Sequence, residues 1–365
     1  MPFRYKKYYD LLYLLLELFK LFKLFKLFRL WRRWCRLMEK HVLQWHITHK
    51  CNLRCTHCYQ EEYQADLSFD KIEKIFYDYM EFLQKKGYQG HINITGGEPL
   101  LYPDLYSMLD LMEKHRITFG LLTNGTLLEK DNVEKLSRYK QLSFVQISLD
   151  GVRETHESIR GKGSFEKSMK GLKLLHHYKI ISMVSFTAHK KNYKQLQEVV
   201  KIAEKHKVKR FWTDRLIPIG NCEEILSTEE FLEYTRVLNQ EAERAKRKFW
   251  SKMTVHQNRA LQFCKNGGNV YHCSAGINLL TILANGDIVP CRRLPIVFGN
   301  VLEEPVLQLY EKSEIIQNLN QKHIPKECEC CYKAEKCRGG LKCLTYAVTG
   351  ELEKKDINCP IAFGQ

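Results

Sequence analysis

Three cysteines stand close together in the stretch THKCNLRCTHCYQ. Cys51, Cys55 and Cys58 have the spacing CxxxCxxC and follow directly after the apolar, strand-like run HVLQWHI. Three thiolates on one loop can hold three irons of a 4Fe-4S cluster and leave the fourth iron open to a small molecule. Zinc is the alternative metal, but a structural zinc site needs four protein ligands, and His49 or His57 would have to supply the fourth.

The remaining cysteines are also clustered. Of fourteen cysteines in the chain, nine lie between residues 264 and 359, and only Cys35 and Cys222 stand elsewhere. The chain shows no secretory signal, so this clustering favours metal sites over disulfide bonds and predicts the reducing cytoplasm as the location.

The chain is long enough, at 365 residues with 44% apolar residues, to bury a large core. Its net charge of +16 is concentrated near the N-terminus, because residues 1–40 contain eleven Lys or Arg and three Asp or Glu. The rest of the chain shows no basic stripe with interleaved aromatic residues and no nucleic-acid-binding motif, so we expect no nucleic-acid partner.

Residues 1–38 contain repeats of Leu-Phe-Lys, which place lysines around half the circumference of a helix. Such a helix can lie in an anionic membrane interface or bind a partner peptide, and it can also simply pack on the body of the protein. The longest uncharged run, residues 11–16, is too short to span a membrane. Peripheral membrane contact is therefore one hypothesis for this segment.

Short apolar, β-branched runs recur along the rest of the chain, and most gaps between them show helical spacing of apolar residues. The runs cover residues 43–48, 91–95, 117–123, 144–149, 180–187 and 208–213. Strands and helices in alternation predict an α/β fold with about six parallel βαβ units. Functional residues in such folds lie on the loops at the C-terminal ends of the strands.

Two further local signals appear after the sixth run. Ser227 and Glu230 have capping-box spacing and predict the start of one long helix. The run NLLTILANGDIVPC predicts a hairpin around its Asn-Gly turn. The sequence becomes rich in cysteine and loses its periodicity beyond about residue 255, which predicts a second domain there.

Polar motifs follow the first four predicted strands and should meet at one mouth of the barrel. The cysteine loop follows the first strand, GGEPL the second, TNGT the third and SLDG the fourth. In GGEPL the glycines permit close approach of the backbone to a ligand, and Glu98 can accept a hydrogen bond from an ammonium group.

The cysteine motif followed by Tyr59, at the end of the first strand, resembles the radical SAM superfamily. The resemblance implies a partial (β/α)6 TIM-type barrel in which the open iron chelates the amine and carboxylate of S-adenosylmethionine. An electron from the cluster then gives methionine and a 5′-deoxyadenosyl radical, with Cys51, Cys55 and Cys58 at the centre of catalysis. It also implies that Glu98 binds the amine and Arg160 the carboxylate of the methionyl group. Ser148 and Asp150 would bind ribose hydroxyls or nearby groups of S-adenosylmethionine. The implied cofactor-binding residues are Tyr59, Gly96, Gly97, Glu98, Pro99, Thr123, Asn124, Ser148, Asp150 and Arg160.

The C-terminal cysteines resemble the SPASM domain, an extension of radical SAM enzymes that carries auxiliary 4Fe-4S clusters. The resemblance assigns one cluster to Cys264, Cys273, Cys291 and Cys343, assigns the other to Cys328, Cys331, Cys337 and Cys359, and leaves Cys330 unassigned. Five residues separate Cys337 from Cys343 where the family usually has three, which bears on the assignment of Cys343. A first auxiliary cluster with three thiolates and an open site, and a zinc-ribbon-like knot, are the alternatives.

The expected organisation has four parts. These are a basic amphipathic helix (1–40), a radical SAM core barrel (41–215), a linking helix (216–255) and a SPASM domain (256–365).

The resemblance implies a maturase that modifies a ribosomally made precursor peptide by a thioether or carbon–carbon crosslink or by epimerisation. Formylglycine formation is disfavoured, because Arg292 and Arg293 stand where the sulfatase-maturating members carry an Asp base. The implied partners are the precursor peptide, a reductant such as flavodoxin or ferredoxin, and a separate leader-binding protein. Alternatives are the modification of a small molecule such as a tetrapyrrole or quinone precursor, and a non-catalytic iron–sulfur scaffold.

Overall fold

The computed structural model describes residues 39–59, 65–218, 224–247, 253–257, 261, 270–271, 273–321 and 323–361. Residues 1–38 of the predicted N-terminal helix (1–40), with their membrane-contact hypothesis, and the predicted ligand Cys264 lie outside these residues. The predicted end of this helix is wrong, because Lys40 is already the first residue of a strand. Within the described ranges, no helix has the length and apolar character that a membrane span requires.

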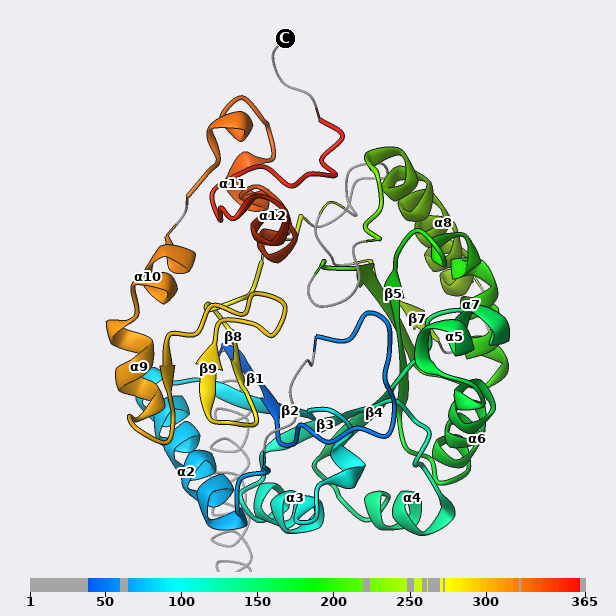
Figure 1. The fold of residues 1–365 in the computed structure, drawn as a ribbon, viewed down its shortest axis with the longest axis vertical. Helices are drawn as coiled ribbons and strands as arrows, with labels where there is room; N and C mark the ends of the chain where they lie inside the picture. The colour runs from blue at the N-terminus through cyan, green and yellow to red at the C-terminus, as the bar shows by residue number, and fades with distance from the viewer. Residues whose placement is uncertain are drawn as a thin grey trace, which may run out of the picture.

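In the part of the chain that the structure describes, the strands form a single curved sheet of ten (Figure 1). Strands β1 to β6 pair in sequence order, each parallel to the next, which confirms the predicted α/β barrel of six strand–helix units. The parallel strands are β1 (Lys40–His46), β2 (Gln89–Thr95), β3 (Thr118–Thr123), β4 (Leu142–Ser148), β5 (Ser182–Ala188), β6 (Arg210–Arg215) and β7 (Thr254–Val255). The remaining strands are β8 (Leu279–Ile282), which is parallel to β1, and β9 (Asp287–Val289) and β10 (Gly299–Asn300), which continue the sheet in antiparallel pairs.

Helices α2 to α8 lie along the outer side of the curved sheet (Figure 1). They are α2 (Phe69–Lys86), α3 (Leu105–Lys114), α4 (Lys130–Leu136), α5 (Arg153–Arg160), α6 (Ser164–His177), α7 (Leu196–Lys205) and α8 (Thr228–Arg247). The C-terminal helices are α9 (Val306–Lys312), α10 (Glu314–Asn320), α11 (Ala334–Cys337) and α12 (Lys342–Thr349), and short 3-10 turns occur at η1 (Pro99–Leu101), η2 (Tyr193–Gln195) and η3 (Lys326–Cys328). The predicted capping box begins α8: Ser227 N donates to Glu230 Oε2 at 2.8 Å, and Glu230 N donates to Ser227 Oγ at 3.2 Å.

Successive side chains along a strand alternate between two environments. In β1 and β2, Leu43, Trp45 and Ile92 are fully buried in the core that the helices cover. The intervening residues, such as Gln44 and Asn93, are only half-buried and lie on the opposite, inner face of the barrel. The apolar core of these two strands therefore lies outside the sheet, and their inner face carries polar side chains such as Gln44 and Asn93.

The C-terminal region completes the sheet in a way that the sequence did not predict. The predicted hairpin is present, with β8 and β9 antiparallel around Asn285 and Gly286. In addition, β8 pairs in parallel with β1, with Val42 opposite Leu279. This pairing covers the backbone edge that β1 would otherwise expose.

A buried ion pair also joins the C-terminal region to the barrel. Arg215 at the end of β6 donates to both carboxylate oxygens of Asp356, at 2.7 and 2.8 Å, and to Asn358 at 2.8 Å. Both charged side chains are almost completely buried, and the guanidinium lies 4.5 Å from the centre of the Phe231 ring. The segment that ends at Cys359 is therefore fixed to the C-terminal end of β6.

Candidate active site

The loop of Cys51, Cys55 and Cys58 leaves the C-terminal end of β1, as predicted. Cys58 N donates to Cys55 O at 3.1 Å, and Thr56 N donates to Ile159 O at 3.0 Å, so the loop is folded back and tied to α5. Burial raises the pKa of the Cys51 and Cys55 thiols, and the three thiols are close enough to influence one another electrostatically. Cys58 is exposed. The structure therefore gathers the three predicted ligands at one mouth of the barrel.

The two glycines of GGEPL pack against the chain's own backbone. Gly97 N donates to Thr48 O at 2.8 Å, and Glu98 N donates to Lys50 O at 2.7 Å. A Cβ atom on Gly97 would lie 2.2 Å from Lys50 O, and one on Gly96 would lie 2.5 Å from Thr48 O. The close approach that only glycine permits here is to the residues that lead into Cys51.

Gly97→Ala is therefore expected to loosen the cysteine loop. The added Cβ should clash with the backbone of residues 48–50 and displace it. The variant should lose about 1–3 kcal/mol of unfolding free energy and part of the iron bound at Cys51, Cys55 and Cys58. Gly87→Ala is the matched control, because a Cβ there meets no atom within 4 Å and only its left-handed φ of 68° is strained. Thermal unfolding and iron analysis of both variants check the prediction. Equal iron loss in both would show that the contact with Lys50 is unimportant.

Glu98 joins the loop after β2 to the turn after β3. Its fully buried carboxylate accepts hydrogen bonds from Thr123 Oγ1 at 2.7 Å, Asn124 N at 2.8 Å and Leu100 N at 3.3 Å. Burial raises its pKa from 4.5 to about 7, although these three donors act in the opposite direction. A carboxylate offers about four acceptor positions, so one is left for a further donor such as the predicted ammonium group.

The raised pKa of Glu98 predicts a pH-dependent stability. Folding favours the protonated carboxyl, so this stabilisation is fully present below pH 4.5 and is lost as the pH rises through 7, by on the order of 3 kcal/mol. Glu98→Gln should flatten this part of the curve when the unfolding free energy of the iron-free chain is measured by denaturant titration from pH 5 to pH 8. Glu81→Gln, at an exposed position of α2, should leave the curve unchanged. An unchanged slope in Glu98→Gln would contradict the prediction.

Glu98 and its three hydrogen-bond donors are called the Glu98 cradle below. Asn124 connects this cradle to the Cys51 thiol. Its side-chain amide donates to Asn52 Oδ1 at 3.0 Å and points to Cys51 Sγ at 3.9 Å. Its side-chain oxygen Oδ1 accepts from the backbone N–H and the hydroxyl of Thr126, at 2.8 and 2.7 Å. Asn52 Nδ2 in turn donates to Thr126 Oγ1 at 2.9 Å. Asn52 and Thr126 were missed from the sequence, because their role depends on the meeting of two loops 74 residues apart.

Asp150 forms a second buried network. It accepts from Arg160 Nε at 2.6 Å and from Thr187 N at 2.9 Å, and His57 Nε2 lies 3.4 Å from the same carboxylate. Burial alone would raise the pKa of Asp150, but Arg160 and then His57 hold it well below its usual range. Arg160 Nη1 also lies 3.7 Å from Cys55 Sγ. The predicted Asp150 and Arg160 thus pair with each other and support the cysteine loop.

His57 differs from its sequence interpretation as a zinc ligand. It is buried against Asp150, and its ring lies 6.3 Å from the His189 ring. Burial lowers its pKa to about 4, so it is neutral near pH 7. The predicted Ser148 is the last residue of β4 and lies opposite Ser185 of β5.

Tyr59 extends from the cysteine loop toward the C-terminal region. Arg292 Nη2 donates to Tyr59 O at 2.8 Å, and its guanidinium lies 5.4 Å from the centre of the Tyr59 ring. Burial raises the pKa of Tyr59, Arg293 opposes this shift, and Cys343 and Cys291 add to it. Tyr59 therefore lies between the first group of thiols and the C-terminal cysteines.

The C-terminal cysteines form two groups. Electrostatic interactions link Cys273, Cys291 and Cys343, and others link Cys328, Cys331 and Cys359. Burial raises the pKa of Cys343 well above its usual range and that of Cys328 to about 11. Cys337 is buried at the end of α11, and the unassigned Cys330 is exposed.

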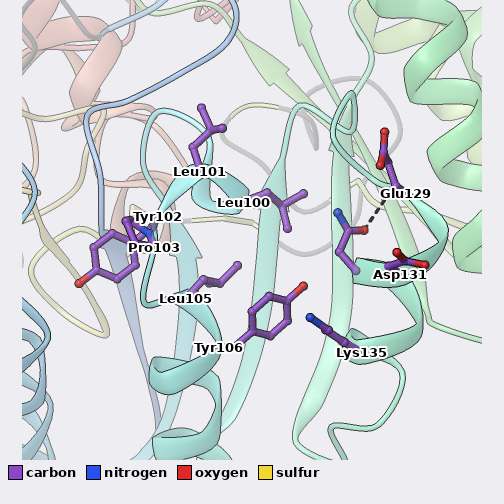
Figure 2. A pocket seen from close by; sticks show the side chains of 10 residues that line it. Leu100, Leu101, Tyr102, Pro103, Leu105, Tyr106, Glu129, Asp131 and Lys135 are labelled. Carbon is purple, nitrogen blue, oxygen red and sulfur yellow. Dashed lines mark hydrogen bonds between the residues drawn. The ribbon is translucent and has the colours of Figure 1, made fainter.

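A pocket of about 360 Å³ lies beside the GGEPL loop, between η1, α3 and the start of α4 (Figure 2). Leucine and tyrosine side chains form much of its lining, and Glu129, Asp131 and Lys135 lie at its α4 side. Leu100 belongs both to this pocket and to the Glu98 cradle. Its described lining includes none of the predicted ligands, so the pocket is separate from the thiol sites.

The donor set of the barrel mouth fits an iron–sulfur cluster. N–H groups of Leu53, Asn124 and Arg160 point to thiol sulfurs, at 3.4, 3.9 and 3.7 Å, and such donors stabilise thiolate ligands. Among the described residues, no three His, Cys, Asp or Glu side chains converge on a point that could hold a metal ion. A cluster needs less convergence, because each thiolate binds a different iron.

Comparison with known proteins gives two families and several relatives. The family described as the radical SAM superfamily matches residues 45–217, and SPASM, described as an iron–sulfur cluster-binding domain, matches residues 273–332. The subtilosin biosynthesis protein AlbA of Bacillus subtilis is 30% identical over 80% of this chain, which spans 63% of that protein. The AdoMet-dependent heme synthase of Methanosarcina barkeri is 27% identical over 87% of this chain and 95% of that protein. The mycofactocin maturase MftC of Mycolicibacterium smegmatis is 26% identical over 88% of this chain and 83% of that protein.

Solved structures share the fold. Streptococcus suis SuiB bound to S-adenosylmethionine has a TM-score of 0.72 at 18% identity, over 88% of this chain and 78% of that chain. The anSMEcpe structure with bound AdoMet and a peptide has a TM-score of 0.68 at 20% identity, over 87% of this chain and 93% of that chain. The two family matches imply 4Fe-4S clusters and S-adenosylmethionine as cofactors. The chain belongs to the radical SAM superfamily and carries a C-terminal SPASM domain.

Proposed function

We propose that the chain is a maturase that modifies a ribosomally synthesised precursor peptide by radical chemistry. The observation that carries this proposal is the contact between Tyr59 and Arg292, which brings the cysteine loop of β1 against the turn that bears Cys291. A substrate at the barrel mouth would therefore lie beside the cysteine loop of β1 and also beside the turn that bears Cys291. An extended peptide suits such a site, because it can enter from the mouth and expose one residue at a time.

The chain's own residues prepare the first site. Cys51, Cys55 and Cys58 would hold the cluster that binds S-adenosylmethionine, and together these groups supply reductive cleavage of the sulfonium and abstraction of a hydrogen atom from carbon. Asn124 donates toward Cys51 and Arg160 toward Cys55, which fixes the loop and tunes the thiolates. Glu98 orients Asn124 through its backbone N–H.

We assign the auxiliary ligands by the two groups of thiols. Cys273, Cys291 and Cys343 would hold one auxiliary cluster, with Cys264 as the fourth ligand or with an open position there. Cys328, Cys331, Cys337 and Cys359 would hold the other. The electrostatic interactions among Cys273, Cys291 and Cys343, and among Cys328, Cys331 and Cys359, support this division, including the assignment of Cys343 despite its unusual spacing. Cys337 is assigned by the resemblance.

The relatives favour a peptide substrate. The relatives include the antilisterial bacteriocin subtilosin biosynthesis protein AlbA, the mycofactocin maturase MftC and the sporulation killing factor maturation protein SkfB. SuiB, which has the same fold, has been solved with its precursor peptide SuiA, at a TM-score of 0.70 and 18% identity. Recognition of the leader would fall to a separate protein or to residues 1–38, and a flavodoxin or ferredoxin would supply the electron.

The test is an anaerobic reaction with dithionite, S-adenosylmethionine and the peptide encoded by a short reading frame beside the gene. A crosslink lowers the peptide mass by two hydrogen atoms, and epimerisation leaves the mass unchanged but alters the amino-acid chirality. Cys51→Ala should give no change, and Cys330→Ala, at the exposed and unassigned cysteine, should react like the wild type. If 5′-deoxyadenosine forms but the peptide stays unmodified, the result would count against the proposal.

A tetrapyrrole is the second candidate substrate. The alignment with this chain covers 95% of the M. barkeri heme synthase but only 63% of AlbA. The same anaerobic reaction with an iron tetrapyrrole in place of the peptide tests this candidate. A changed absorption spectrum and mass of the tetrapyrrole, with an unmodified peptide, would favour it.

A further inference from the structure

The turn that carries Cys291 also carries two arginines with different partners. Leu294 N donates to Cys291 O at 2.8 Å, so Arg292 and Arg293 are the two central residues of a tight turn. Arg292 N donates to the hydroxyl of Thr281 on β8 at 3.1 Å, which fixes the turn on the sheet. The Arg292 side chain reaches Tyr59. The two neighbouring arginine side chains therefore point away from the turn to different partners.

Arg293 reaches across to the C-terminal end of β6. Its Nη1 donates to Asp214 Oδ2 at 2.5 Å, and its Nη2 donates to Arg215 O at 2.6 Å. Its side chain is 19% exposed and that of Asp214 is 6% exposed, so the pair is shielded from solvent. Asp214 is itself fixed, because its Oδ1 accepts from Arg215 N at 2.9 Å. The guanidinium is thus a positive charge held in one place.

This fixed charge lies near the first auxiliary group of thiols. Cys343 packs in one buried cluster with Leu294, which follows Arg293, and with Ile217, which lies just beyond the end of β6. Cys273 and Cys291 pack against the same cluster. The guanidinium is held between the Cys291 turn and the end of β6, so it lies beside the cluster of side chains that contains the three thiols.

We propose that Arg293, held by Asp214, is a positioning residue that raises the reduction potential of the auxiliary cluster of Cys273, Cys291 and Cys343. Reduction adds one electron to the cluster, and a nearby positive charge stabilises the added negative charge. Asp214 opposes this effect but helps to hold Arg293, and Arg215 O still holds the guanidinium when Asp214 is replaced by Asn. The inference rests on the proposed ligand assignment and is independent of the substrate.

Charge changes of opposite sign distinguish this effect from damage to the fold. The background is the full chain with Cys51, Cys55 and Cys58 replaced by alanine, so that only auxiliary clusters contribute. Redox titration of dithionite-reduced protein, followed by electron paramagnetic resonance, gives the potential of each cluster. The cluster of Cys328, Cys331, Cys337 and Cys359 serves as an internal reference.

Arg293→Gln is expected to shift the first auxiliary potential to more negative values, and Asp214→Asn to more positive values. Arg293→Lys, which keeps the charge, should stay near the parent. Arg292→Gln is the matched control, because it removes the same charge from the same turn but from a side chain that reaches Tyr59. Its shift should be smaller than that of Arg293→Gln, and the reference cluster should not move in any variant.

Two results would overturn the inference while leaving the proposed function intact. One is equal shifts in Arg293→Gln and Arg292→Gln, and the other is a negative or absent shift in Asp214→Asn. If Arg293→Gln fails to retain auxiliary iron, the sign of the Asp214→Asn shift decides. Retention of both auxiliary signals after Cys343→Ala would instead overturn the ligand assignment, and the inference with it.

Discussion

Replacement of Cys51, Cys55 and Cys58 together by alanine is expected to abolish the cleavage of S-adenosylmethionine while leaving most of the iron bound. The three thiols form one loop at the end of β1, and the cysteines assigned to the auxiliary clusters form two other groups. Three four-iron clusters predict about twelve iron atoms per chain, and the triple variant should keep about eight. Iron analysis and chromatography of 5′-deoxyadenosine measure both quantities.

The control for this experiment is Cys330→Ala, which removes an exposed and unassigned thiol. It should retain about twelve iron atoms and normal cleavage. Loss of all iron from the triple variant would show that the three groups of cysteines do not bind independently. Retained cleavage would show that the barrel mouth is not the site of the chemistry.

The second large effect concerns the ion pair that holds the C-terminal segment on the barrel. Asp356→Ala leaves Arg215 buried without its carboxylate partner, which typically costs about 3–5 kcal/mol of unfolding free energy. Asp356 also accepts from Leu341 N at 2.8 Å and Asn358 N at 3.0 Å, close to Cys343 and Cys359. The variant should therefore lose auxiliary iron as well as stability, measured by thermal unfolding and iron analysis.

Glu353→Ala is the matched control, because it removes a carboxylate of the same segment whose partner, His323, is exposed. It should change stability little, since exposed ion pairs contribute little. The double variant Arg215→Met, Asp356→Leu should recover part of the lost stability, because no buried charge remains. Equal stability of Asp356→Ala and Glu353→Ala would contradict the role assigned to the buried pair.

The barrel could be predicted from the sequence because its signals are local. Each strand is a short apolar run, each helix has its own periodicity, and α2 ends at Gly87 with a left-handed φ of 68°. The rule that functional loops follow parallel strands then placed the cysteine loop, Glu98, Asn124 and Asp150 at one mouth. The structure brings these residues together.

The features that the sequence did not predict depend on contacts between distant parts of the chain. Strand β8 pairs with β1 across more than half of the chain, and Arg215 lies 141 residues from Asp356. The partners of Glu98 and Asp150 within the protein were also missed, because both carboxylates were interpreted as ligands for a cofactor. No local pattern distinguishes a carboxylate that binds a ligand from one that supports a loop.

The central claim is that a radical generated at the barrel mouth abstracts hydrogen from a precursor peptide. The most direct measurement uses that peptide with deuterium at its carbon positions, in the anaerobic reaction with S-adenosylmethionine and dithionite. The predicted result is deuterium in the 5′-deoxyadenosine, recovered together with modified peptide. Formation of 5′-deoxyadenosine without deuterium, from an unmodified peptide, would contradict the claim.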